Sequence, residues 1–385
     1  MSPFSFDLKD RAGQALTGAG RWDVPTFFVY FKQKRMKQPP YLRDSEFDTL
    51  CRILMERYQG QTFDYQEDTY RRIIQQVKTR MLNDTSRVAE SPIPVITNKD
   101  EFYKYFLAQQ PVILKHFVDK DTLKEYTLDK VVDRFGDHTV RFTDESGDTY
   151  KSLHHLKENA DHKYIHNCGL LTALHPEILD DLQIGSIHEL VQKNPDVHLF
   201  VSQMFLGNSK KLRPKLLNVF HNANATSFFV MLSGKKKWTM IDPMWSPLLH
   251  VDLDNDMCQR FLLERKHNEL FDLIPKQVAT LEPGDLLLTP YFYWHGVENV
   301  STKTVAIANR CLFSKVRMDT LMDEFRKVND TWKYVETARL KAYYKHHKMN
   351  LDKTFMWNLR YANEEEFYQK TLKEGIDKFT SSKKI

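Results

Sequence analysis

Two histidines occupy positions in the sequence where a metal ion could bind. His221 lies just before an apolar run at residues 227–232, and His295 directly follows the aromatic-rich stretch 289–294. Neutral imidazole is the commonest metal ligand in proteins. Strands of a barrel can bring two such residues together at one open end, where a metal and a small ligand fit. From spacing alone, a structural or surface role for either histidine stays open.

Three consecutive lysines at positions 235–237 form a second candidate feature, after a turn at Gly234. Side chains alternate across a strand, so one of the three is expected to point inward. An inward amine is a mobile point charge that suits a carboxylate ligand. The alternative is a solvated turn with no ligand.

The segments around these residues are typical of many short strands. The expected strands are 94–96, 111–114, 138–143, 197–205, 227–232, 237–241, 278–281, 286–288 and 304–313. Turns rich in Gly and Pro, such as 283–285, separate several of them, which favours a sandwich, jelly roll or barrel. Helical spacing of apolar residues marks 44–82, 128–135 and a long amphipathic stretch after residue 316. Thr97 followed by Asp100 is typical of a capping box that opens another helix.

A set of motifs runs in order through the same region. They are Pro111-Val112-Ile113-Leu114, the segment from His221 to Phe229, Gly234-Lys235-Lys236-Lys237-Trp238, Asp242-Pro243, Pro283-Gly284-Asp285, Pro290, Trp294-His295, Glu298-Asn299 and Asn309. Together, residues 93 to about 313 resemble the JmjC branch of the cupin superfamily, which belongs to the Fe(II)/2-oxoglutarate-dependent oxygenases. Within that branch they resemble the asparaginyl hydroxylases.

The resemblance implies a site with named residues. The family holds iron with a histidine, a carboxylate two residues later and a distal histidine. His221 matches the first ligand and His295 the last. Lys236 matches the lysine that pairs with the far carboxylate of 2-oxoglutarate, and Asn218 and Asn309 match polar positions around this cosubstrate and the distal ligand. The implied cofactors are Fe(II) and 2-oxoglutarate.

The sequence departs from the family at the carboxylate ligand. Ala223 stands two residues after His221, and a methyl group cannot donate to a metal. Water or another side chain could fill the position, with Asn222, Asn224 and Asp252 as nearby candidates. Chloride could also fill it, as in the iron halogenases that carry Ala or Gly there. A third outcome is a barrel that no longer binds iron.

Three functions follow from this reading. The first is a dioxygenase that hydroxylates a side chain of a protein or another macromolecule. The second is a degenerate barrel that binds a partner or a small molecule without turnover. The third is a halogenase-like enzyme that uses the position of Ala223.

The expected fold class is a mainly β core, a double-stranded β-helix (jelly roll) with helical additions at both ends. We divide the chain into a mostly helical extension at 1–90, the JmjC/cupin-like barrel at 91–315 and a C-terminal helical region at 316–385. In related hydroxylases such C-terminal helices form a dimer interface, so a homodimer is one expectation. The partner implied by the resemblance is a protein substrate.

Composition sets further expectations. The formal net charge is only +5 over 385 residues, which does not favour a dedicated nucleic-acid-binding protein. The four cysteines form no CxxC pair, which favours a reducing compartment. No stretch reaches the roughly 20 apolar residues of a membrane span, and residues 1–11 lack the apolar run of a signal peptide. We therefore expect a soluble intracellular protein of the cytoplasm or nucleus.

Overall fold

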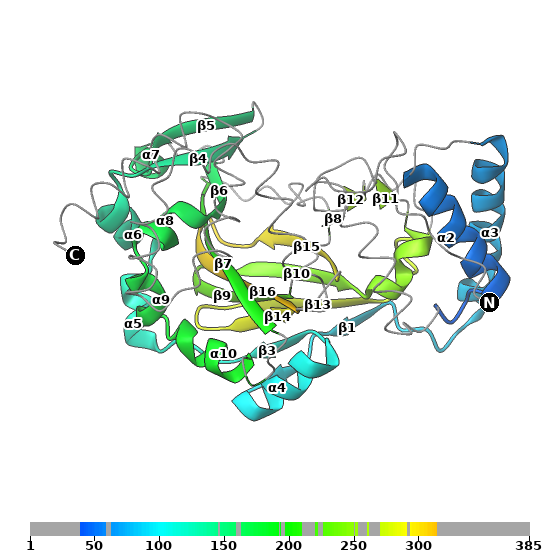
Figure 1. The fold of residues 1–385 in the computed structure, drawn as a ribbon, viewed down its shortest axis with the longest axis horizontal. Helices are drawn as coiled ribbons and strands as arrows, with labels where there is room; N and C mark the ends of the chain where they lie inside the picture. The colour runs from blue at the N-terminus through cyan, green and yellow to red at the C-terminus, as the bar shows by residue number, and fades with distance from the viewer. Residues whose placement is uncertain are drawn as a thin grey trace.

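The structure is a computed structural model of the chain (Figure 1). It describes residues 39–58, 63–144, 147–158, 163–191, 193, 197–209, 220–221, 226–249, 251–252, 260–261, 270–290 and 293–313. The expected C-terminal helices at 316–385, and the dimer interface assigned to them, lie outside the described residues.

Two sheets make up the centre of the molecule. Seven strands lie in the order β1-β13-β10-β15-β8-β12-β11, and nine in the order β2-β3-β14-β9-β16-β7-β6-β4-β5. The first sheet contains β1 (Glu90–Pro92), β8 (Phe220–His221), β10 (Lys236–Ile241), β11 (Val251–Asp252), β12 (Arg260–Phe261), β13 (Lys276–Leu281) and β15 (Trp294–Asn299). The second contains β2 (Val95–Ile96), β3 (Val112–Leu114), β4 (Thr139–Asp144), β5 (Gly147–Ser152), β6 (Lys163–Cys168), β7 (Val197–Asn208), β9 (Thr226–Ser233), β14 (Leu286–Thr289) and β16 (Lys303–Phe313).

The connection between the sheets is that of a jelly roll. The neighbours β14-β9-β16-β7 in the nine-stranded sheet face the neighbours β13-β10-β15-β8 in the seven-stranded sheet, and the chain passes repeatedly from one set to the other. This order is that of a double-stranded β-helix. The predicted fold class is therefore confirmed.

The strands alternate between an inner and an outer face. One core cluster takes side chains from both sheets and fills the space between them; it includes Phe229, Met231, Trp238, Met240, Leu281, Leu287, Ala306 and Ala308. The residues between these on β9 and β16, such as Phe228, Val230 and Ile307, belong to a different cluster under the helices. Alternation thus sets which residues face the barrel interior.

Short helices cover the outer face of the nine-stranded sheet (Figure 1). They are α4 (Lys99–Ala108), α5 (Lys120–Glu125), α6 (Leu128–Phe135), α7 (His155–Glu158), α8 (Gly169–Leu174), α9 (Glu177–Asp181) and α10 (Ile184–Val191). The cap of α4 is Asn98, whose side chain accepts from the backbone N–H of Asp100 at 2.7 Å. The expected capping box on Thr97 is therefore wrong by one residue, since the asparagine oxygen already satisfies this N–H.

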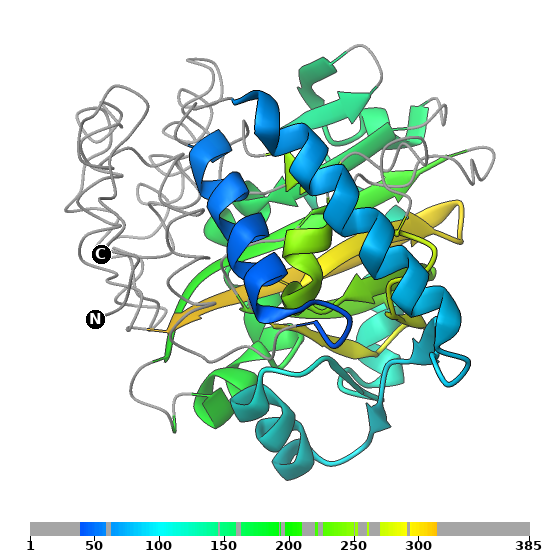
Figure 2. The same cartoon turned by 90° about the vertical axis from the view of Figure 1, so that its right-hand side faces the viewer.

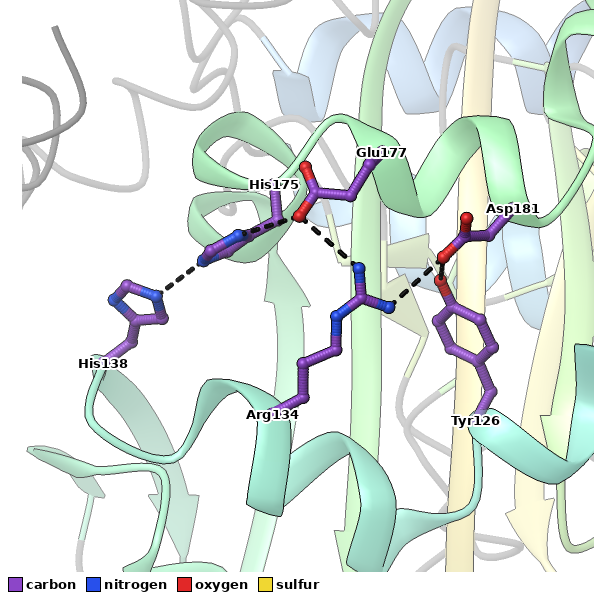
Figure 3. Close-up of polar contacts among 6 residues, drawn as sticks. All are labelled: Tyr126, Arg134, His138, His175, Glu177 and Asp181. Carbon is purple, nitrogen blue, oxygen red and sulfur yellow. Dashed lines mark hydrogen bonds and ion pairs between the residues drawn. The ribbon is translucent and has the colours of Figure 1, made fainter. Parts of the chain in front are cut away.

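A network of polar contacts, called the polar seam below, links α6 and its neighbours to α9 (Figure 3). Its six residues are Tyr126, Arg134, His138, His175, Glu177 and Asp181. The Nε2 atoms of His138 and His175 lie 2.7 Å apart, and Nδ1 of His175 lies 3.2 Å from Glu177 Oε1. Arg134 reaches Glu177 at 3.5 Å and Asp181 at 3.2 Å. The seam ties the α6 region to α9 and to the residues that precede it.

An antiparallel helix pair, α2 (Asp44–Tyr58) and α3 (Asp64–Asn83), lies at the opposite end of the molecule from α5 and α6 (Figures 1 and 2). Arg80 of α3 donates to Glu46 of α2 at 2.7 Å and holds the two helices together. Within the described part of the chain, no helix combines the length and the apolar character that a membrane crossing requires.

Candidate functional site

The two predicted histidines are direct neighbours in the seven-stranded sheet. His295 of β15 lies opposite His221 of β8 in the antiparallel register. Their ring centroids are 4.3 Å apart and the ring planes meet at 58°. The sheet thus brings together two residues that are distant in sequence, while their role as metal ligands stays a prediction.

The hydrogen bonding of His295 fixes how its ring can act. Its Nδ1 lies 2.9 Å from the carbonyl oxygen of Tyr293, so Nδ1 carries the proton and donates it. Nε2 is then left with a lone pair that can bind a metal. Burial, and next the charges of His221 and Arg310, hold the pKa of His295 well below its ordinary value. The ring is therefore neutral at physiological pH, as a metal ligand must be.

The segment that carries His295 is anchored by a short 3₁₀ helix, η1 (Pro243–Leu248). The hydroxyl of Tyr293 donates to Asp242 Oδ2 at 3.1 Å, just before this helix. The indole Nε1 of Trp294 donates to Ser246 Oγ at 2.7 Å. Both residues that precede His295 are thus tied to η1, which restricts where its imidazole can lie.

The N-terminal helices support the same strands from outside. Phe220 and Trp294, which directly precede the two histidines, are buried in a core cluster shared with α2, α3 and η1. Tyr70 of α3 also donates to the backbone carbonyl of Leu248 at 3.4 Å. Because side chains alternate across a strand, a residue next to each histidine points into this cluster. The α2–α3 pair therefore packs against the outer side of the two strands that carry the histidines.

Lys236 is the inward residue of the lysine run. Its side chain is 1% exposed, whereas Lys235 and Lys237 are exposed, as strand alternation predicts. Its Nζ lies 2.5 Å from Asn299 Oδ1 and 3.5 Å from the hydroxyl of Tyr164. Burial lowers the pKa of Lys236 to about 7. A carboxylate bound here would restore the charged form of the amine.

The sequence reasoning missed Tyr164 of β6. Its ring lies 5.0 Å from Lys236 Nζ, and burial raises the pKa of its phenol, which stays protonated and can donate. Opposite it on β7 stands Gly207, where a Cβ atom would meet Thr304 Oγ1 at 2.7 Å. Tyr164 lies outside the motifs of the resemblance, and a lone tyrosine in a strand gives no other signal.

The predicted asparagines are placed differently from the histidines. Asn309 is buried on the helix-facing side of β16, where its Oδ1 accepts from Ser202 Oγ at 2.7 Å. Its Nδ2 lies 3.5 Å from the carbonyl of Phe228. The structure does not bring Asn309 together with the histidines or with Lys236, because this face of the strand points away from the barrel interior.

Asn218, Asn222, Ala223 and Asn224 lie outside the described residues, as does the side chain of Asp252. Within the described ranges, no group of three or more His, Cys, Asp or Glu side chains is arranged to hold a metal ion.

The donor set fits iron in part. Two adjacent imidazoles, one with its proton fixed on Nδ1, match two of the three ligands of a facial triad. The third, a carboxylate, is an alanine in the sequence. A buried amine with neutral partners fits the far carboxylate of a dicarboxylate.

The match to a family model agrees with this fold. The sequence profile of the cupin-like domain matches residues 127–310. The search of curated proteins gave no match. Among solved structures, the X-ray structure of ycfD from E. coli matches with 12% identity and a TM-score of 0.35, over 57% of this chain and 54% of that chain. The chain thus spans about half of that protein. Residues 127–310 of this chain form a cupin-like domain.

Proposed function

We propose that the chain is an Fe(II)- and 2-oxoglutarate-dependent oxygenase that hydroxylates a side chain of a protein or another macromolecule. The observation that carries this proposal is the pair of neighbouring histidines on the same sheet as a buried lysine. Lys236 and His295 lie on the paired strands β10 and β15, offset by four residues, or about 13 Å along the strand.

Each residue has a defined task in this proposal. His221 and His295 would hold the iron, and Lys236 with Tyr164 would hold the far carboxylate of 2-oxoglutarate. When bound, the iron and 2-oxoglutarate supply the oxidative decarboxylation that drives hydroxylation. The apolar residues between the sheets, with Trp238 stacked 5.5 Å from His295, would keep water away from the reacting atoms.

One observation favours a second function. The sequence lacks the carboxylate ligand at Ala223. This absence should cost at least the 10–100-fold in metal affinity or activity that is typical of losing a group that only orients a metal ligand. A cupin-like barrel that binds a small molecule without turnover is therefore the rival proposal. A halogenase-like reaction, with chloride in place of the carboxylate, is third. A homodimer through residues 316–385 also remains a proposal.

Consumption of 2-oxoglutarate, measured with and without iron and with and without chloride, separates these proposals. We expect iron-dependent consumption by the wild type that falls to background in His295→Ala. His154→Ala, which changes an exposed histidine outside the barrel, should retain wild-type consumption. Consumption that requires chloride would favour the halogenase. Identical background rates for wild type and His295→Ala would leave only the binding protein.

A further inference from the structure

The hairpin of β4 and β5 is joined to the helices α8 and α9 through two histidines of the polar seam (Figure 3). His138 directly precedes β4, and His175 directly follows α8. Their Nε2 atoms lie 2.7 Å apart, whereas their ring centroids lie 4.9 Å apart. The two nitrogen atoms therefore point toward each other. One proton between them makes an N–H···N hydrogen bond.

The contact of the other ring nitrogen decides which histidine donates. Nδ1 of His175 lies 3.2 Å from Glu177 Oε1, and a carboxylate oxygen only accepts, so Nδ1 carries a proton. In the neutral ring, Nε2 of His175 is then the acceptor and Nε2 of His138 the donor. A first added proton on His138 keeps this contact, because an imidazolium still donates from Nε2. A second proton must bind Nε2 of His175, and two N–H groups then face each other at 2.7 Å.

The charged groups around the two rings do not remove this conflict. Glu177 of α9 favours protonation of His175 but lies at Nδ1, not at the nitrogen that faces His138. Arg134 of α6 disfavours it, and burial has the largest effect, so the pKa of His175 lies below its ordinary value of 6.5. The remaining titratable groups at this junction pair with one another: Tyr126 and Arg134 with Asp181, His154 with Asp137, and Lys157 with Asp133.

The hairpin connects these histidines to the barrel interior. The N–H of Leu153 donates to the carbonyl of His138 at 2.9 Å, so His138 lies at the base of the hairpin. Further along, β4 lies beside β6 in the nine-stranded sheet, with Thr143 opposite Tyr164 (Figure 1). The hydroxyl of Tyr164 lies 3.5 Å from Lys236 Nζ. A change at the base of the hairpin therefore acts on a strand that borders the interior.

We propose that the His138–His175 pair is a pH-sensitive switch, which holds the β4–β5 hairpin to the junction of α8 and α9 near neutral pH and releases it when both imidazoles are protonated. The second proton replaces a hydrogen bond by two like charges whose donors face each other, which is unfavourable at this distance. Because histidine changes its charge close to neutral pH, release begins below about pH 6.5. Arg134 still joins α6 to α9 through Glu177 and Asp181, so the release is local. The switch does not depend on the proposed oxygenase function.

Hydrogen–deuterium exchange of the full chain, followed by mass spectrometry of peptides from residues 136–158, tests the proposal. Wild type and His175→Gln are compared at the same pH, which cancels the pH dependence of chemical exchange. Glutamine keeps an acceptor for His138 but takes up no proton. We expect equal exchange at pH 7.5 and, below about pH 6.5, faster exchange in the wild type by up to tenfold for each pH unit. His154→Gln, which changes an exposed histidine next to the hairpin, should keep the wild-type pH dependence.

A second measurement needs no variant. In wild type labelled with 15N-histidine, the shifts of the imidazole nitrogens report when each ring binds a proton. Protonation of both rings without faster exchange in the hairpin would overturn the proposal, as would the same pH dependence in His175→Gln. Loss of the pH response in His154→Gln as well would also overturn it, because the response would not belong to the pair. Exchange in residues 163–168 that rises with the hairpin would support the connection to Tyr164, and unchanged exchange there would overturn that connection.

Discussion

The hydrogen bond between Trp294 and Ser246 links η1 to the strand that carries His295, and its effect on the histidine pair can be measured. Ser246→Ala leaves the buried indole N–H of Trp294 without its acceptor at 2.7 Å. An unsatisfied buried donor costs about 1–3 kcal/mol. The serine hydroxyl also donates to the carbonyl of Pro243 at 2.6 Å, and the loss of this bond adds about 1 kcal/mol. We expect the free energy of unfolding to fall by about 2–4 kcal/mol.

The same change should weaken metal binding, because Trp294 directly precedes His295 on β15. Loss of a group that orients a metal ligand typically costs about 10–100-fold in affinity. Urea denaturation gives the stability, and titration with Co(II), followed by visible absorption, gives the affinity of the folded protein. Ser186→Ala is the control, since this half-buried serine, far from the histidines in the fold, also donates to a backbone carbonyl.

A double-mutant cycle separates this hydrogen bond from general loosening. Trp294→Phe removes the N–H itself, so adding Ser246→Ala to it should cost only the bond to Pro243. The two changes should therefore be less than additive by about 1–3 kcal/mol. Strict additivity, or a Ser246→Ala protein as stable and as tight for Co(II) as the Ser186→Ala control, would refute the reasoning.

Three further predictions follow from burial and charge. Because a carboxylate binds the ammonium form of Lys236, whose pKa is about 7, affinity for 2-oxoglutarate should fall up to tenfold for each pH unit above about 7. A flat titration profile between pH 6 and 9 would contradict this. Gly207→Ala places a methyl 2.7 Å from Thr304 Oγ1. Because Gly207 lies opposite Tyr164, this crowding should weaken binding of 2-oxoglutarate at least 10-fold. Circular dichroism checks that the variant folds. Burial lowers the pKa of His175 in the folded protein below that in the unfolded chain (Figure 3). As the pH falls below about 6.5, the unfolded chain therefore binds a proton that the folded protein does not, and the free energy of unfolding decreases. The difference in Tm between pH 7 and pH 5 should be smaller in His175→Gln, and an unchanged difference would exclude this titration.

The spacing of apolar residues and the positions of turn residues predict several of the strands and helices. The turn at Gly234 and the alternation after it predict β10 within one residue, and the same alternation selects Lys236 among three lysines. The predicted helix at 128–135 matches α6, which buries Val131 and Val132 on one face. These elements can be predicted because burial of one face makes apolar residues recur at a regular spacing in the sequence.

Long-range packing could not be read in the same way. The helical spacing of α2 and α3 predicts two amphipathic helices but not the surface against which they pack. That surface is the outer side of β8 and β15, through Phe220 and Trp294. The sequence gives no pairing of strands, so the support that the helices give to both histidines becomes visible only in three dimensions.

The face of β16 on which Asn309 lies shows the limit most sharply. Neighbouring residues on a strand face opposite sides, so a shift of one position reverses every assignment on that strand. On β16 the pairing shifts against β9 between Val305 and Ala306, and against β7 between Arg310 and Cys311. Such irregularities leave no mark in the composition of a strand. A motif match to Asn309 therefore names a segment, but only the register shows that Asn309 faces the helices and that Arg310 faces the barrel interior.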